Sequence, residues 1–183
     1  NVLEVNPVLI GGKPLELALE QKKAVLQAII SPLSIVSGGP GTGKTSVALT
    51  ILRVLKKLGL AERPALVAPT GKAANRMSES VINGLKSIQN LNKLKHDLEL
   101  LDFASDAKTI HRLLGYHADR HSFRHHEYDP LEHDLLIIDE GSMIDQELMI
   151  RLLRASNSKL SYLLPVMRII ILGDAQQLPS VGN

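Results

Sequence analysis

Short apolar runs alternate with longer amphipathic stretches along this chain. Four of the runs are nearly uninterrupted and end at glycine, proline or acidic residues, which is typical of buried β-strands. Between them, apolar residues recur every three or four positions, and this spacing predicts helices. The expected strands are 33–36, 65–68, 135–138 and 167–172, and the expected helices are 14–31, 47–58, 72–82, 85–101 and 144–153.

Strands that alternate with helices indicate an α/β fold. Continuous apolar strands are typical of parallel sheets, so we expect a mostly parallel sheet covered by helices on both faces, with right-handed crossovers. The stretch 85–101 has one apolar face, which we expect to cover the core rather than a partner protein. A further strand is expected at 123–126, before a turn at 129–130.

Composition narrows the class of protein. With 183 residues and 44% apolar content, the chain can bury one substantial core, and its length favours a single domain. The absence of cysteine excludes disulfide frameworks and thiolate metal sites, which fits a cytoplasmic protein. No apolar run approaches the roughly 20 residues that span a bilayer, so we expect no membrane partner.

Charge is distributed unevenly along the chain. Lys and Arg outnumber Asp and Glu by 13 to 5 in residues 1–95, whereas acidic residues outnumber basic ones by 14 to 8 in residues 96–183. A basic half can attract a polyanion, but ordinary solvated helix faces explain the same counts. Charge alone therefore leaves a nucleic-acid partner open.

A glycine-rich loop after the first expected strand carries the strongest chemical signal. The stretch GGPGTGKT at 38–45 matches the pattern G-x-x-x-x-G-K-[ST] and lies between a strand and a helix, as that pattern requires. Its backbone N–H groups can turn toward phosphate oxygens, Lys44 would reach the β- and γ-phosphates of ATP, and Thr45 would ligate Mg²⁺. The expected nucleotide-binding residues of this loop are Gly38, Gly39, Pro40, Gly41, Thr42, Gly43, Lys44, Thr45 and Ser46.

Two acidic residues follow the strand expected at 135–138. Asp139 and Glu140 are thereby placed at the carboxyl edge of the sheet, where ligands bind. Beside a phosphate loop, Asp139 would hold Mg²⁺, and Glu140 would orient and deprotonate the water that attacks the γ-phosphate. A strand that ends in two acids is common by itself, so this interpretation depends on the loop.

Two other strand ends carry polar residues suited to a nucleotide or to DNA. GDAQQ at 173–177 supplies amides, and Gln177 is our candidate sensor of the γ-phosphate or the attacking water. APTGK at 68–72 brings Pro69, Thr70 and Lys72 to a helix N-terminus, where a hydroxyl and a cation can meet a DNA phosphate. Taken singly, both segments are also ordinary turns.

In this order, the motifs resemble those of superfamily 1 DNA helicases, and within them the RecD type, the alpha subunit of exodeoxyribonuclease V. The resemblance implies a P-loop NTPase (RecA-like) fold with a leading helical segment at 1–32 and a motor lobe at 33–183. It rests on Gln21, GGPGTGKT at 38–45, APTGKAA at 68–74, TIHRLLG at 109–115, IIDEGSMID at 137–145 and GDAQQLPSVG at 173–182.

The resemblance also implies roles for single residues. Gln21 would contact the adenine, and Thr70 would touch single-stranded DNA. Thr109 and His111 would lie near the DNA path or couple it to the nucleotide; from the residues alone, Thr109 is equally a helix N-cap and His111 a surface residue. The chain departs from the family at Gly141, where alanine is usual, and at 156–165, which lengthens the approach to the last strand.

The activity implied is ATP-driven 5′–3′ movement on single-stranded DNA in double-strand break repair, with RecB- and RecC-like partners. Such helicases use two lobes, and an arginine of the second contacts the γ-phosphate. We therefore expect this chain to be a first lobe, part of a longer protein, with little ATPase activity alone. Alternatives are a P-loop kinase or other NTPase that never meets DNA, and a non-enzymatic assembly lobe that docks through helix 85–101.

Five histidines at 117, 121, 125, 126 and 133 raise the question of a second metal site. His117 and His121 could share a helix face, but no carboxylate pattern completes a zinc site. ATP and Mg²⁺ are therefore the only cofactors that we expect.

Overall fold

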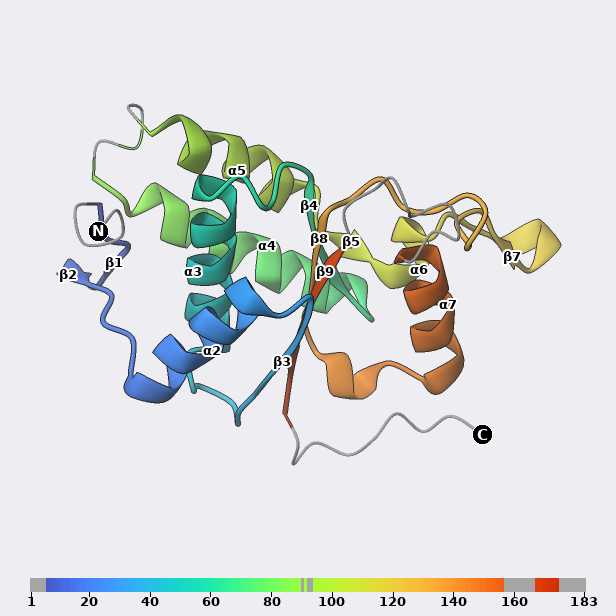
Figure 1. The fold of residues 1–183 in the computed structure, drawn as a ribbon, viewed down its shortest axis with the longest axis horizontal. Helices are drawn as coiled ribbons and strands as arrows, with labels where there is room; N and C mark the ends of the chain where they lie inside the picture. The colour runs from blue at the N-terminus through green and yellow to red at the C-terminus, as the bar shows by residue number, and fades with distance from the viewer. Residues whose placement is uncertain (1–5, 90, 92–93, 157–166, 175–183) are drawn as a thin grey trace.

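A five-stranded parallel sheet lies at the centre of the computed structural model, which describes residues 6–89, 91, 94–156 and 167–174 (Figure 1). The strand order is β3-β9-β8-β4-β5, and every pairing is parallel. The predicted parallel sheet is therefore confirmed. The strands are β3 (Leu33–Ser37), β4 (Pro64–Ala68), β5 (Lys108–Thr109), β8 (Leu135–Ile138) and β9 (Arg168–Gly173).

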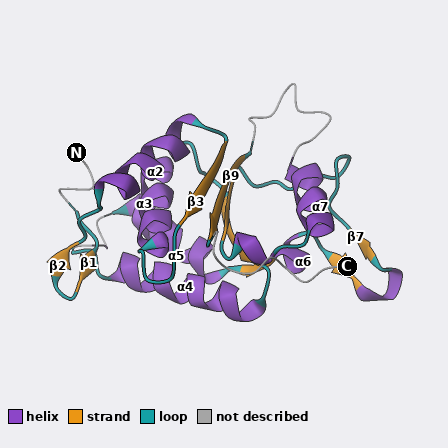
Figure 2. Cartoon of the chain, turned by 90° about the horizontal axis from the view of Figure 1, so that it is seen from below, coloured by secondary structure: helices purple, strands orange, loops and turns teal. Residues whose placement is uncertain are grey.

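Helices cover both faces of this sheet, as Figures 1 and 2 show. Four of them pack into one apolar cluster: α2 (Leu19–Ile30), α3 (Lys44–Lys57), α4 (Gly71–Lys86) and α5 (Lys95–Ser105). The other face is covered by α6 (Ile110–Leu113) and α7 (Gln146–Ser156). No helix in the described part of the chain has both the length and the apolar character to cross a membrane.

Burial explains why the strands are apolar. In β8, Leu135 and Ile137 face the first cluster, and Leu136 and Ile138 face the second, so all four side chains are buried. Burying one such side chain contributes about 1.5–3 kcal/mol, which favours this strand at the centre of the sheet. The edge strand β3 differs, because the described helices leave its residue Ile35 70% exposed.

The first helix is shorter than its pattern suggested. Lys13–Pro14 form strand β2, which pairs antiparallel with β1 (Leu9–Ile10), and α2 begins only after Ala18. The prediction of a helix from Pro14 was wrong because the fixed φ of proline suits an edge strand as well as a first helical turn. The helix start is instead set by Gln21, whose Oε1 accepts the Ala18 N–H at 2.8 Å.

The stretch 85–101 is two elements rather than the predicted single helix. α4 ends at Lys86 and α5 begins at Lys95, so the leucine spacing continues from one helix into the next. Leu85 and Leu100 are nevertheless buried in the same cluster, which confirms that this face covers the core. The alternative of a non-enzymatic assembly lobe that docks through a helix at 85–101 is not supported, because these side chains are buried and not available to a partner.

A small hairpin follows α6. Strands β6 (Tyr116–His117) and β7 (Ser122–Phe123) pair antiparallel around the 3-10 helix η2 (Ala118–Arg120). The strand predicted at 123–126 therefore overlaps β7 only at Phe123, and His126 instead forms an isolated bridge with Asp129. His117 and His121 share no helix face, because the first lies in β6 and the second ends η2.

Candidate functional site

The loop between β3 and α3 has backbone geometry that requires glycine. Gly41 and Gly43 have φ angles of +75° and +78°, which glycine adopts without strain. At Gly38, a Cβ atom would lie 2.6 Å from the Thr42 hydroxyl oxygen, which itself donates to the Gly39 carbonyl oxygen at 2.8 Å. Gly43 is also the N-cap of α3, so the unpaired N–H groups of the first helical turn border this loop.

Lys44 folds back over the loop that it ends. Its Nζ atom donates to the carbonyl oxygens of Gly38 at 2.5 Å and Gly39 at 2.8 Å. A cation and a helix N-terminus are thereby brought together with a row of backbone amides, a combination that favours a bound anion. The described geometry therefore fits the phosphates of a nucleotide.

Gln21 connects α2 to this loop. Its Nε2 atom donates to the Thr42 carbonyl oxygen at 2.8 Å, and a Cβ at residue 43 would lie 2.8 Å from the same nitrogen. The amide therefore packs against the loop backbone at Gly43, which has no side chain. The structure brings Gln21 to the nucleotide loop, and its contact with adenine stays a prediction.

The two acids follow β8 at the same edge of the sheet. The Asp139 N–H donates to the Val67 carbonyl oxygen at 2.9 Å, so this residue continues the pairing with β4. Its Oδ1 atom accepts the Glu140 N–H at 2.9 Å, and Glu140 has a φ of +51°. In the described sheet β9 lies between β3 and β8, so residues 139 and 140 follow a strand two places from the one that leads into the phosphate loop, at the same carboxyl edge.

The end of β9 lies between these two groups. The Gly38 N–H donates to the Gly173 carbonyl oxygen at 3.1 Å, which joins the phosphate loop to this strand. Asp174 follows and is 6% exposed. The proposed sensor Gln177 lies outside the described residues.

Thr70 follows β4, and Thr109 is the last residue of the neighbouring strand β5. The register pairs Ala68 with Thr109, so both hydroxyls lie at the same edge as the phosphate loop. Each is a helix N-cap: Thr70 Oγ1 accepts the Ala73 N–H, and Thr109 Oγ1 accepts the Arg112 N–H, both at 3.2 Å. The capping interpretation of Thr109 is confirmed, whereas its role at DNA is untested.

His111 is exposed and lies in an aromatic cluster that sequence reasoning missed. Its ring centroid lies 5.5 Å from that of Tyr116 and 5.6 Å from that of Phe123. The Arg151 guanidinium lies over the Phe123 ring at 5.2 Å. Because these residues come from α6, the hairpin and α7, only the folded chain brings them together.

The strand order divides the carboxyl edge into two halves. The phosphate loop, Asp174 and the acidic pair follow β3, β9 and β8, while Thr70 follows β4 and Thr109 ends β5. Lys72 is exposed in the first turn of α4, and Pro69 is half-buried. In the described part of the chain, no group of three or more His, Asp or Glu residues could hold a metal ion.

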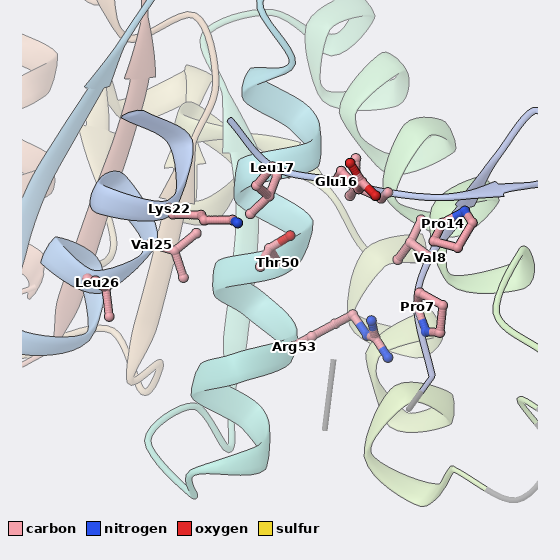
Figure 3. Close-up of a pocket in the computed structure, with 11 residues that line it drawn as sticks. Pro7, Val8, Pro14, Glu16, Leu17, Lys22, Val25, Leu26, Thr50 and Arg53 are labelled. Atoms are coloured by element: carbon pink, nitrogen blue, oxygen red, sulfur yellow. The ribbon is translucent and has the colours of Figure 1, made fainter. Parts of the chain in front are cut away.

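A pocket of about 800 Å³ lies between the N-terminal segment, α2 and α3 (Figure 3). Its walls are mainly apolar, with Lys22, Thr50 and Arg53 among the polar residues. It contains no residue of the phosphate loop, so it is distinct from the phosphate site.

Known proteins are similar to this chain over most of its length. The chain is 44% identical over 162 residues to the RecBCD enzyme subunit RecD of Haemophilus influenzae, an alignment that covers 88% of this chain and 24% of the relative. It is 36% identical over 165 residues to the ATP-dependent RecD2 DNA helicase of Deinococcus radiodurans, covering 90% of this chain and 18% of the relative. The chain thus spans about a quarter or less of the length of these relatives.

The fold is that of a P-loop, RecA-like domain. It is similar to the crystal structure of Bacteroides Pif1 in complex with ADP-AlF4, with a TM-score of 0.55 and 25% identity over 92% of this chain and 34% of that chain. The AAA domain model matches residues 21–183, a range that includes Gln21, the phosphate loop and the acidic pair. The chain therefore belongs to the AAA domain family of nucleotide-binding proteins.

Proposed function

We propose that this chain is the ATP-binding motor domain of a DNA helicase. In the whole protein, it couples ATP hydrolysis to 5′–3′ movement along single-stranded DNA, in recombinational repair of double-strand breaks. The observation that carries the proposal is the divided sheet edge, with Lys44 and the acidic pair on one half and Thr70 and Thr109 on the other. The names of the RecD and RecD2 relatives point in the same direction.

Residues of the phosphate loop bind the nucleotide in this proposal. Lys44 exchanges its bonds to the Gly38 and Gly39 carbonyl oxygens for the β- and γ-phosphates, and free backbone N–H groups of the loop and of the first turn of α3 surround them. Gln21, already against the loop backbone, contacts the adenine. The Thr45 hydroxyl and the Asp139 carboxylate are oxygen donors of the kind that Mg²⁺ prefers.

Glu140 is the general base of the proposed reaction. Its carboxylate orients a water molecule, takes its proton and so directs the oxygen toward the γ-phosphorus. Gln177 hydrogen-bonds the γ-phosphate or this water. When bound, ATP supplies the γ-phosphoryl group that is transferred to water, with ADP as the leaving group, and Mg²⁺ would neutralise part of the negative charge on the phosphates.

The second half of the edge takes DNA. Thr70 and Lys72 flank the N-terminus of α4, where a hydroxyl, free backbone N–H groups and an ammonium group can hold a DNA phosphate. Thr109 and His111 occupy the corresponding place at α6, and Pro69 shapes the approach to α4. β4 pairs with both β8 and β5, so this one strand connects the acidic pair to the proposed DNA side of the edge.

The remaining parts of the proposal concern the whole protein. The segment 1–32 leads into a motor lobe at 33–183, and a second lobe supplies an arginine to the γ-phosphate. The protein acts in the cytoplasm with RecB- and RecC-like subunits. The partner subunits follow the name of the RecD relatives, of which this chain spans only a part, and the other assignments follow the resemblance of the motifs.

The test is ATP turnover by the full-length protein with and without single-stranded DNA. We expect DNA to stimulate turnover several-fold and Lys44→Ala to abolish it, because the loop then has no cation for the phosphates. Turnover that ignores both DNA and this substitution would contradict the proposal. Phosphate transfer to a protein or small-molecule acceptor, rather than to water, would favour the kinase alternative.

A further inference from the structure

The turn after β8 holds Glu140 in an uncommon conformation. Gly141–Met143 form the 3-10 helix η3, and Glu140 precedes it with a φ of +51°. The left-handed region costs free energy for a residue with a side chain, so it persists only where surrounding contacts hold it. The Met143 N–H donates to the Glu140 carbonyl oxygen at 2.9 Å, which closes the turn but does not attach it to the sheet.

Gly141 is the residue through which this turn touches β9. A Cβ at this position would overlap the Cγ2 methyl group of Ile171 and lie 3.3 Å from the Leu172 carbonyl oxygen. The next residue is also close, because Ser142 N lies 3.6 Å from the position of a Cβ at Gly173. The turn therefore packs directly against the last residues of β9, because Gly141 has no side chain to separate them.

The same strand end reaches the phosphate loop. β3 stays in register with β9 up to the pair Ser37 and Gly173, and the Gly38 N–H donates to the Gly173 carbonyl oxygen at 3.1 Å. β9 thus contacts the loop on one side and the Glu140 turn on the other. A displacement of the turn relative to β9 would change the position of the Glu140 carboxylate relative to the loop.

We propose that the absence of a side chain at Gly141, which lets the turn pack against β9 at Ile171, sets the position of the Glu140 carboxylate relative to the phosphate loop. Gly141 is a positioning residue, since it does not touch the reacting atoms, and the proposal rests on the role of Glu140 given above. Alanine at position 141 would collide with the Cγ2 methyl group of Ile171. A side chain at position 171 that is not branched at Cβ, such as leucine, lacks that methyl group and makes room for the alanine.

The test is a double-substitution series measured as ATP turnover of the full-length protein. Gly141→Ala should lower kcat by about 10- to 100-fold, because a displacement of about 1 Å can reduce a rate by about 10². KM for ATP should stay within about threefold, since the substitution leaves the phosphate loop unchanged. Ile171→Leu alone, a volume-conserving control, should stay near wild type. Combined with Gly141→Ala, it should restore kcat to within about threefold.

Three measurements decide between the outcomes. Wild-type kcat in Gly141→Ala overturns the proposal, and so does a double variant as slow as Gly141→Ala alone. Loss of nucleotide binding or of the cooperative thermal transition in Gly141→Ala, not reversed by Ile171→Leu, overturns it as well.

Glu140→Gln, run in parallel, should bind ATP and slow hydrolysis by about 10² or more. If Glu140→Gln hydrolyses ATP at the wild-type rate, Glu140 is not the general base, and the positioning proposal fails with it. If Glu140→Gln is slow but Gly141→Ala is as fast as the wild type, only the positioning proposal fails.

Discussion

The guanidinium group of Arg53 and the carboxylate of Asp97 form a buried, two-pronged ion pair. Nε lies 2.8 Å from Oδ1 and Nη2 lies 3.1 Å from Oδ2, while the side chains are 2% and 1% exposed. Arg53 Nη2 also donates to the Asn6 carbonyl oxygen at 2.9 Å. This pair therefore joins the helix that starts at the phosphate loop to α5 and to the N-terminal segment.

Removing one partner of this pair should destabilise the domain strongly. We expect Asp97→Ala to lower the free energy of unfolding by about 3–5 kcal/mol, because it leaves the Arg53 charge buried and unpaired. Glu20→Ala is the matched control, since the Lys23–Glu20 pair is exposed and such pairs contribute about 0–1 kcal/mol. Chemical denaturation of the full-length protein measures both. Equal losses in the two variants would contradict the buried pair as a source of stability.

Substituting Gln21 separates its two possible roles, which are holding the phosphate loop and contacting the adenine. We expect Gln21→Ala to weaken ATP binding about 3- to 10-fold, because it removes the hydrogen bond to the Thr42 carbonyl oxygen. If Gln21 also contacts the adenine, the variant should lose preference for ATP over GTP. Titrations with both nucleotides measure this, and Lys22→Ala, an exposed neighbour on α2, is the control. An unchanged preference would restrict Gln21 to holding the loop.

DNA affinity should depend on the cation at the start of α4. We expect Lys72→Ala to weaken single-stranded DNA binding and to reduce the slope of log affinity against log salt by about 0.7, the value for one lost phosphate contact. Lys23→Ala, an exposed cation on α2, serves as the control. Binding isotherms at several salt concentrations measure the slope. An unchanged slope would remove Lys72 from the DNA path.

Acid should destabilise the chain partly through His133. Burial lowers the pKa of His133 below its usual 6.5, with neighbouring positive charges adding to the effect, although a hydrogen bond with the Arg63 carbonyl oxygen opposes it. The unfolded chain then binds this proton more readily than the folded chain. Stability from His133 is therefore full above pH 6.5 and is lost as the pH falls through the folded pKa.

His133→Asn tests this contribution. Asparagine can keep a side-chain N–H near the Arg63 carbonyl oxygen but does not titrate, so the variant should lose less stability between pH 7.5 and pH 5 than the wild type. Denaturant unfolding curves at both pH values give the difference. His126→Asn, at an exposed histidine of the hairpin region, should behave like the wild type. Parallel pH profiles for His133→Asn and wild type would contradict the assignment.

The sequence alone determined the features that depend on local chemistry. The central strands could be predicted because a strand buried on both faces must be apolar, and 135–138 is the clearest case. The phosphate loop could be predicted because its backbone geometry requires glycine at Gly41 and Gly43. The acids were placed correctly at the sheet edge because they follow a strand directly.

Only the tertiary structure decided which distant residues meet. The leucine spacing through 85–101 did not reveal the end of α4 at Lys86, and β5 is too short to leave a periodic signal. The contacts of Gln21 with Thr42, Arg53 with Asp97 and Gly141 with Ile171 join residues 21 or more positions apart. Such contacts depend on how the helices and strands pack in three dimensions, and local spacing carries no information about that packing.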